Sequence, residues 1–357
     1  MADINSTDLV QQFASDNYSG ICPEVWAAME TANRGHVSGY GDDPWTAAAA
    51  DAFRELFETD CEVFFAFNGT AANSLALASL CQSYHSVICC QSAHVETDEC
   101  GAPEFFGAGL KLVELPGAGA KITPDMLTTA LKGYGGHSPH QMIASALSLT
   151  QASEAGTVYR PDEIAALCAI AHERALAVHM DGARFANALV RLEVTPAQMT
   201  WRSGIDVLSF GATKAGALAA EAVVFFDTAR AAFFAERRKR AGHLLSKHRF
   251  LAAQFDAALA EDRWLKLARH ANAMADRLAQ KLAAIGLAPA WPVESNLVFV
   301  ALPRALDARL KAAGARYYVR PSESLEVDID RVLVRLVTSF ATREDEVDRF
   351  VALCKKF

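Results

Sequence analysis

The sequence predicts an α/β protein with a large domain on a mostly parallel sheet and a smaller α+β domain at its C-terminal end. From about residue 60 to 226, short apolar runs alternate with amphipathic stretches, as in βαβ units. After Gly286 the alternation gives way to a mixture of strands and helices typical of an α+β unit. The chain has 357 residues, more than one compact core usually holds. We expect an N-terminal arm and large domain over 1–245, and a connecting helix and smaller domain over 246–357.

The large domain is expected to contain seven short strands, each an apolar run bounded by turn residues. These runs are 62–67, 86–90, 111–115, 142–150, 176–180, 206–210 and 221–226. Helices are expected at 71–82 and 161–174, and Pro161 with two acidic residues in the first turn suits the positive end of the second.

The C-terminal third begins with a long helical region, expected from about residue 228 to 285. The basic segment ERRKRAGHLLSKHR lies near its start, and such a charge run commonly forms a solvated helix face. Beyond it, strands are expected at 297–301 and 333–338 and helices at 305–314 and 343–355.

Composition and charge exclude several classes of protein. The net charge of -8 leaves no basic footprint for nucleic acid or an anionic membrane. Residues 1–20 lack the pattern of a signal peptide, and no stretch approaches the ~18 apolar residues of a membrane span, so we expect a cytoplasmic protein. The eight cysteines form no CxxC pair and are expected to be reduced and mostly buried.

The first candidate site residue follows the strand 176–180, in the motif Asp181-Gly182-Ala183-Arg184. Open α/β sheets place their ligands at the carboxyl ends of the strands, so a carboxylate there is a candidate for ligand binding. Taken alone, an aspartate in this position is also a common helix cap.

A second strand end carries Ser209-Phe210-Gly211-Ala212-Thr213-Lys214. A lysine can form a Schiff base only if its amine lies near a carbonyl and is partly desolvated, and small neighbours leave room for a flat ring. A loop lysine by itself is usually solvated. The two strand ends together favour a functional role for Lys214.

A third strand end, after residues 62–67, runs into Asn68-Gly69-Thr70 and a helix. Exposed amides at a helix N-terminus, with the hydroxyl of Thr70, can hold a phosphate, although a simple capping role is equally compatible with this motif alone. With Lys214 and Asp181 it provides partners for a phosphate, an aldehyde and a ring nitrogen, the three handles of pyridoxal 5′-phosphate.

On these motifs the chain resembles the fold type I pyridoxal-phosphate enzymes and, within them, the threonine aldolases of the β-eliminating-lyase group. The resemblance covers nearly the whole chain. It includes Ser15-Asp16-Asn17-Tyr18, Tyr40-Gly41-Asp42-Asp43-Pro44, His94-x4-Glu99-x-Gly101 and Arg335-Leu336-Val337-Thr338. It implies pyridoxal phosphate as cofactor, Lys214, His94 and Asp181 as catalytic residues, and no metal.

The resemblance also implies a role for each matching residue. Gly69 and Thr70 would bind phosphate, His94 would stack on the ring, and Asp181 would keep the ring nitrogen protonated. Arg184 would pair with the cofactor's phenolate oxygen or with the substrate carboxylate. The substrate pocket would comprise Ser15, Asn17, Tyr40, Arg184 and Arg335.

Family active sites lie at a subunit interface, so the resemblance implies a homodimer or homotetramer. Tyr40 would enter the site from a neighbouring subunit. Arg240 or Lys247 would reach the partner's phosphate, as an alternative to the solvated helix face.

The implied activity is aldol cleavage of L-threonine, L-allo-threonine and relatives such as phenylserine to glycine and an aldehyde. His94, Glu99 or a water between them would take the hydroxyl proton. Many relatives carry a histidine in the loop that here reads Gln151-Ala152-Ser153-Glu154-Ala155-Gly156-Thr157, so no role of that histidine carries over.

Three alternatives stay open at this point. Another β-eliminating lyase or an aminotransferase would keep the cofactor and change the bond broken. A non-catalytic binder would keep only the fold. A metalloprotein would use His137 and His140, or His94 with Glu96 and Asp98; the first pair lies in a Gly- and Pro-rich loop with no third ligand at a fixed offset, and both groups are expected to be solvated loop residues.

Overall fold

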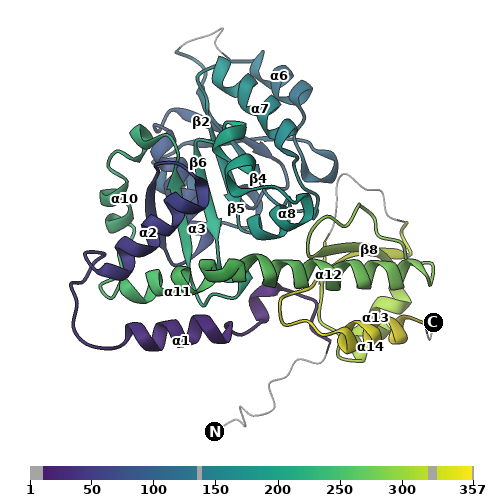
Figure 1. Ribbon diagram of the computed structural model, residues 1–357. Helices are drawn as coiled ribbons and strands as arrows, with labels where there is room; N and C mark the ends of the chain where they lie inside the picture. The colour runs from purple at the N-terminus through teal and green to yellow at the C-terminus, as the bar shows by residue number, and fades with distance from the viewer. Residues whose placement is uncertain (1–10, 135–138, 321–327, 356–357) are drawn as a thin grey trace.

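A computed structural model describes residues 11–134, 139–320 and 328–355 of the chain; His137 lies outside them. A seven-stranded sheet and a three-stranded sheet are linked by the long helix α12 (Arg263–Ala283), which runs below both in Figure 1. The expectation of a large, mostly parallel sheet followed by a smaller α+β part is therefore confirmed. The domain boundary between residues 245 and 246 stays a prediction.

The large sheet has the strand order β1-β7-β6-β5-β4-β2-β3. Its strands are β1 (Glu62–Ala66), β2 (His85–Cys90), β3 (Lys111–Leu115), β4 (Ile143–Thr150), β5 (Ala177–Gly182), β6 (Val207–Gly211) and β7 (Glu221–Phe225). Pairing is parallel from β6 through β3, and only β7 runs antiparallel to both of its neighbours, β1 and β6. The carboxyl ends of the other six strands therefore share one edge.

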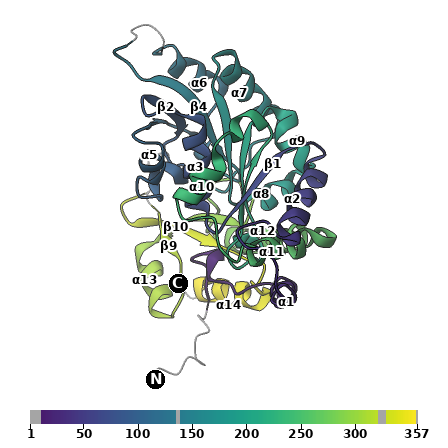
Figure 2. The ribbon, with the colours of Figure 1, turned by 90° about the vertical axis from the view of Figure 1, so that its left-hand side faces the viewer.

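Helices cover both faces of this sheet. Figure 2 shows α3 (Gly69–Leu80), α5 (Ala102–Phe106) and α10 (Phe234–Arg240) on one side, with α2 (Pro44–Phe57), α8 (Phe185–Leu192) and α9 (Pro196–Met199) on the other. Helix α3 crosses the sheet and is buried almost all round, which explains its uniformly small and apolar sequence. On the opposite face the ring of Phe53 packs against those of Phe57, Phe65, Phe210 and Phe255.

The structure contains several helices that were not predicted from the sequence. They include α1 (Pro23–Ala32), α2, α6 (Pro124–Leu131) and α8. Proline opens α1, α2 and α6 at the first helical position, where its missing N–H costs no hydrogen bond. Asp43 caps α2 by accepting a hydrogen bond from Thr46 N at 2.9 Å. These caps are signals that the sequence analysis did not use.

The long helical region expected from about residue 228 to 285 is mostly helical, but it is not one continuous helix. The structure divides it into α10, α11 (Arg249–Leu259) and α12. Gly242 adopts a φ of 79° after α10, and Glu261 and Asp262 adopt φ values of 53° and 54° before α12. Left-handed residues interrupt a right-handed helix, so the helical pattern cannot continue through these positions.

The basic segment is not a uniformly solvated helix face either. Arg238 donates from Nη1 to the carbonyl oxygen of Phe65 at 3.2 Å, and His248 is buried. Arg240 and Lys247 are exposed. Arg238 of this segment therefore faces the sheet, whereas Arg240 and Lys247 face solvent.

The smaller sheet has the order β8-β10-β9, all antiparallel, with β8 (Leu297–Pro303), β9 (Tyr318–Val319) and β10 (Arg331–Val337). Helices α13 (Arg304–Ala312) and α14 (Glu344–Lys355) belong to the same part, and α12 packs against both α8 and α14. The N-terminal segment pairs with this part of the chain, since Val337 N donates to the Phe13 carbonyl oxygen at 2.8 Å and Phe13 N donates to that of Arg316 at 2.8 Å. Residues just after Phe13 are thereby brought close to Arg335.

Two further findings concern the described residues only. No helix there combines the length and apolar character that crossing a bilayer requires. No three His, Cys, Asp or Glu side chains gather there in an arrangement that could hold a metal ion. All eight cysteines are free thiols, and all except Cys100 are buried.

Candidate active site

The carboxyl ends of β4, β5 and β6 place three polar side chains side by side. Thr150 pairs in register with Asp181, and Asp181 with Ser209. Strands buried on both faces end at this edge, where the chain must turn and side chains can meet a ligand. Asp181 therefore lies at the centre of the edge.

A cavity of about 390 Å³ opens over this edge. Six of the residues singled out from the sequence line it: Asn17, Gly69, Thr70, His94, Asp181 and Lys214. The volume lies within the ~300–1,000 Å³ of typical small-molecule sites. Segments distant in the sequence thus converge on one site.

The N-terminus of α3 forms one end of the cavity. Asn68 caps the helix, accepting a hydrogen bond from Ala71 N through Oδ1 at 2.9 Å. Among the described residues nothing accepts a hydrogen bond from the N–H groups of Gly69 or Thr70, and the space beside Gly69 Cα is open to 4 Å. Unused amides at the positive end of a twelve-residue helix fit a phosphate group.

The carboxylate of Asp181 is held by two hydrogen bonds. Asn73 donates from Nδ2 to Oδ2 at 3.0 Å, and Ala183 N donates to Oδ1 at 3.0 Å. Asn73 Nδ2 also donates to Glu99 Oε1 at 2.8 Å, and His94 Nδ1 lies 2.8 Å from that same oxygen. One buried amide thus links Asp181, Glu99 and His94 in a continuous chain of hydrogen bonds.

His94 is the member of this chain that meets the cavity. Its side chain is 34% exposed, whereas that of Glu99 is 0% exposed. The hydrogen bond to Glu99 raises the pKa of His94. Burial raises the pKa of Glu99, partly offset by hydrogen bonds from His94 and Asn73. Glu99 therefore orients His94 and raises its pKa without itself having access to a ligand.

Lys214 enters the cavity from a tight turn after β6. A Cβ at Gly216, whose φ is 100°, would come within 2.7 Å of Leu267 Cδ1 and 3.0 Å of Cys22 Cβ, so only glycine fits there. Beside the lysine, Thr213 Oγ1 donates to Glu221 Oε1 at 2.6 Å. Burial raises the pKa of Glu221 to about 7, against the opposing charge of Lys214.

Arg184 is engaged by a partner the sequence did not reveal. Its Nε and Nη2 donate to the two carboxylate oxygens of Asp16 at 2.9 and 3.1 Å. Asn296 Nδ2 also donates to Oδ2 of Asp16, at 3.0 Å. Burial alone would raise the pKa of Asp16, but the charges of Arg184 and Lys214 and these hydrogen bonds bring it below its ordinary value. Arg184 does not line the cavity of Lys214.

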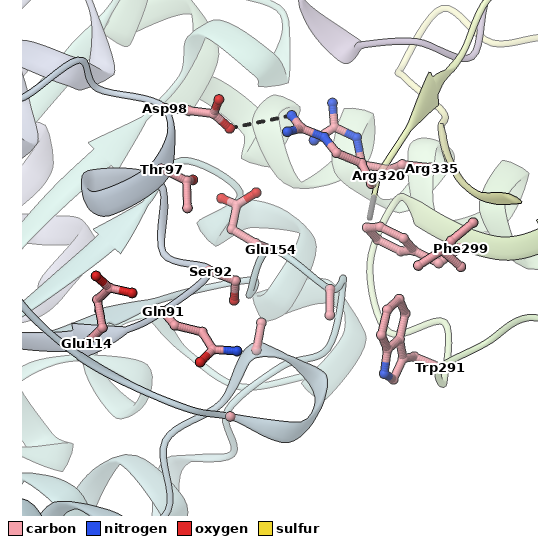
Figure 3. Close-up of a pocket in the computed structure, with 14 residues that line it drawn as sticks. Gln91, Ser92, Thr97, Asp98, Glu114, Glu154, Trp291, Phe299, Arg320 and Arg335 are labelled. Atoms are coloured by element: carbon pink, nitrogen blue, oxygen red, sulfur yellow. Dashed lines mark hydrogen bonds and ion pairs between the residues drawn. The ribbon is translucent and has the colours of Figure 1, made fainter. Parts of the chain in front are cut away.

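A second cavity of about 340 Å³ adjoins the first and contains Arg335; Asp98 lines both (Figure 3). Arg335 is 9% exposed, its Nη2 donates to the Ala14 carbonyl oxygen at 3.5 Å, and its Nε finds no partner among the described residues. Burial, with Arg184 and Arg320 nearby, lowers the pKa of Arg335 to about 10. An anionic group such as a carboxylate would add to the partial balance of this charge by Glu154 and Asp16.

Besides Arg184 and Arg335, four predicted residues lie outside the first cavity. Ser15 uses its Oγ to accept a hydrogen bond from Asn17 N at 3.1 Å. Tyr40 is 53% exposed, and Arg240 and Lys247 point to solvent. The Tyr40 N–H donates to the Ser246 carbonyl oxygen, and Lys239 Nζ lies 4.7 Å from the Tyr40 ring. Within one chain, therefore, Tyr40 belongs to the surface of the basic segment.

The structure adds site residues that the sequence analysis missed. They are Asp16, Asn73, Glu154 and Glu221. Two carried a usable signal: Asn73 is an amide within an otherwise small and apolar helix, and Glu221 opens a wholly buried strand. Asp16 opens a three-residue 3-10 helix and has its partner Arg184 far away in the sequence, and Glu154 lies in a turn.

The fold is that of the fold type I pyridoxal-phosphate enzymes. A family model described as beta-eliminating lyase matches residues 12–305, and the chain belongs to that family.

Sequence and structure comparisons agree on the relatives. The chain is 54% identical to the low specificity L-threonine aldolase of Pseudomonas aeruginosa, over 91% of this chain and 96% of that one. It is 56% identical to the enzyme of the same description from a Pseudomonas species, over 87% and 90%. A solved Leishmania major threonine aldolase matches with a TM-score of 0.90 and 31% identity, covering 97% of this chain and 99% of that one.

The buried Asp16–Arg184 pair predicts a pH-dependent contribution to stability. Asp16→Asn should lower the free energy of unfolding of the cofactor-free protein by about 3–5 kcal/mol near pH 7, because Arg184 is left buried and unpaired. The folded pKa of Asp16 lies below the unfolded value of about 3.9, so this contribution is present above about pH 4 and is lost as pH falls through the folded pKa. Urea unfolding at several pH values measures it.

Asp51→Asn is the matched control, because its partner Arg54 and Asp51 itself are 37% and 71% exposed. That change should alter stability by less than about 1 kcal/mol. A loss for Asp16→Asn no larger than that of the control would contradict the assignment.

Proposed function

We propose that this chain cleaves L-threonine and L-allo-threonine to glycine and acetaldehyde with pyridoxal phosphate as cofactor, and that related β-hydroxy-α-amino acids such as phenylserine are also substrates. The observation that carries the proposal is the convergence of Lys214, Asp181 and the open N-terminus of α3 on one cavity. Identity of 54% and 56% to low specificity L-threonine aldolases supports the same reaction.

The residues of the cavity fit the cofactor group by group. Gly69 and Thr70 would hold the phosphate, Asp181 the ring nitrogen, Lys214 the aldehyde carbon, and His94 would lie against the ring. When bound, pyridoxal phosphate supplies an electrophilic carbonyl and a conjugated ring that accepts the electron pair of a broken Cα–Cβ bond. A buried carboxylate that receives two hydrogen bonds is suited to pair with a protonated ring nitrogen.

Arg335 would bind the substrate carboxylate. Its guanidinium is buried, has a free Nε among the described residues, and faces the second cavity. A planar fork of donors suits a carboxylate better than a single ammonium does. Arg184, which is already paired with Asp16, would act on the site through its charge and its position rather than as a second clamp.

His94 would take the proton of the substrate β-hydroxyl. Glu99 cannot meet a substrate, because its side chain is fully buried, whereas His94 is partly exposed and lines the cavity. With Nδ1 engaged by Glu99, the Nε2 atom is left to face the substrate. General-base catalysis of this kind contributes ~100- to 10,000-fold to a rate.

The complete site would include a second copy of this chain, in a homodimer or homotetramer. Tyr40, Arg240 and Lys247 are exposed, lie outside the first cavity, and belong to one surface around the basic segment. Tyr40 would enter the partner's site, and Arg240 or Lys247 would reach its phosphate. The cytoplasmic location and the domain boundary at residue 245 stay predictions.

The test of the proposed function is a product assay with a lysine variant. Wild-type protein loaded with pyridoxal phosphate should release acetaldehyde and glycine in equal amounts from L-threonine. Lys214→Ala should lose the visible band of the bound cofactor and nearly all aldehyde release, because no amine is left to hold the carbonyl.

Lys121→Ala is a control lysine variant, since Lys121 bonds Glu163 outside the cavity. Aldehyde release by Lys214→Ala at the wild-type rate would overturn the role of the lysine. If the wild type shows the visible band of the bound cofactor but releases no aldehyde, the chain is another β-eliminating lyase or an aminotransferase.

The His94–Glu99 contact predicts a shift in the pH dependence of cleavage. His94 acts as a base only when neutral, so kcat/KM should rise as pH passes through its pKa. The hydrogen bond to Glu99 raises that pKa, so Glu99→Gln should move the acidic limb of the profile to lower pH. If the acidic limb of the kcat/KM profile of Glu99→Gln stays in place or moves to higher pH, His94 is not the general base.

A further inference from the structure

The second cavity differs in character from the first. It is lined on one side by Trp291 and Phe299 and on the opposite side by Gln91 and Glu114 (Figure 3). Arg335 lies at its junction with the cofactor cavity, near Asp98, which lines both. A group bound by Arg335 through its carboxylate would therefore have this cavity beside it.

The apolar wall is aromatic and firmly placed. The rings of Trp291 and Phe299 meet edge to face, with centroids 5.0 Å apart and planes at 84°. Phe299 stands on β8 directly opposite Arg335 on β10, so the wall and the guanidinium are fixed by the same strand pair. Two rings in this arrangement present a surface on which a third ring packs favourably.

The remaining surface of the cavity is acidic. Asp98 is neutralised by Arg320, whose Nη2 lies 3.4 Å from Oδ2. Glu154 points into the cavity, where its charge acts on Arg335 and Arg184, but no described residue forms a hydrogen bond or ion pair with it. Glu114, on the far side, lies near a second carboxylate, since it helps to raise the pKa of Glu96. A ligand here meets an aromatic wall first and hydrogen-bond acceptors beyond it.

We propose that this cavity receives the β-substituent of the substrate, that Trp291 and Phe299 bind aryl groups, and that Glu154 and Glu114 select aryl groups carrying a positive charge or a hydrogen-bond donor. The inference rests on the proposed function and refines its substrate class. A methyl group, as in threonine, leaves most of the 340 Å³ unfilled, whereas an aryl group with a polar tip spans the cavity from the wall to the carboxylates.

Binding of unreactive amino acids tests this inference without cleavage. Dissociation constants would be measured from the change that each amino acid causes in the visible absorption of the cofactor-loaded protein. The ligands are L-alanine, L-phenylalanine, 4-aminomethyl-L-phenylalanine and 4-carboxy-L-phenylalanine. Because the readout is binding, it separates this inference from the proposed function, whose failure shows as absent acetaldehyde release.

In the wild type, the aminomethyl ligand should bind at least about 10-fold more tightly than the carboxy ligand, because of the charges of Glu154 and Glu114. Glu154→Gln should reduce this ratio by about 5-fold. Trp291→Ala should weaken the binding of L-phenylalanine about 10-fold more than that of L-alanine, because the alanine side chain does not reach the aromatic wall. Trp26→Ala, at a tryptophan outside both cavities, should change neither comparison.

Circular dichroism shows whether Trp291→Ala is folded, and Phe299→Leu replaces it if it is not. Equal or reversed binding of the two charged ligands overturns the selection by charge. Equal weakening of phenylalanine and alanine in the folded wall variant overturns the aryl subsite.

Discussion

The site depends on a carboxylate that must remain charged although Asp181 is 3% exposed. Burying an ionised carboxylate is unfavourable unless hydrogen bonds replace its lost water. Asn73 and the backbone of Ala183 provide these bonds. Because Asn73 belongs to α3, the same helix holds Asp181 and places its own N-terminus at the cavity. The groups proposed to bind the ring nitrogen and the phosphate are thus fixed by one rigid element.

Charge is distributed unevenly around this core. The cofactor end contains Asp181, Glu99 and Glu221, which face Lys214 and His94. The substrate end contains the paired Arg184 and the incompletely paired Arg335. A zwitterionic amino acid is complementary to such a gradient, since its carboxylate and its amine are recognised at opposite ends. Beyond Arg335, Trp291, Phe299 and Glu154 line the cavity proposed to bind the substrate side chain.

Much of the fold and part of the site could be predicted from the sequence, because strand ends and helix starts have local signatures. Lys214, Asp181 and Gly69 each lie at or just after the carboxyl end of a strand, and the structure brings all three into one cavity. Asn73 and Asp181 are 108 positions apart in the sequence, and Asp16 and Arg184 are 168 apart, so no local pattern specifies these two contacts, although the amide in the small-sided helix α3 marks Asn73 itself. The break at Gly242 was visible as a glycine, but the helical composition on both sides concealed it. The aromatic wall depends on how β8 pairs with β10, which composition does not specify.

The most direct test of the role of Asp181 is the rate of threonine cleavage by the Asp181→Asn variant, compared with the wild type at equal cofactor occupancy. The substitution keeps the size of the side chain and removes its charge, while Asn73 and the phosphate cup remain to hold the cofactor. We expect the variant to bind cofactor and to lose about 100-fold or more in kcat, because the electron pair of the broken bond is no longer stabilised by a protonated ring. Cleavage at the wild-type rate by the loaded variant would contradict the central role of this carboxylate.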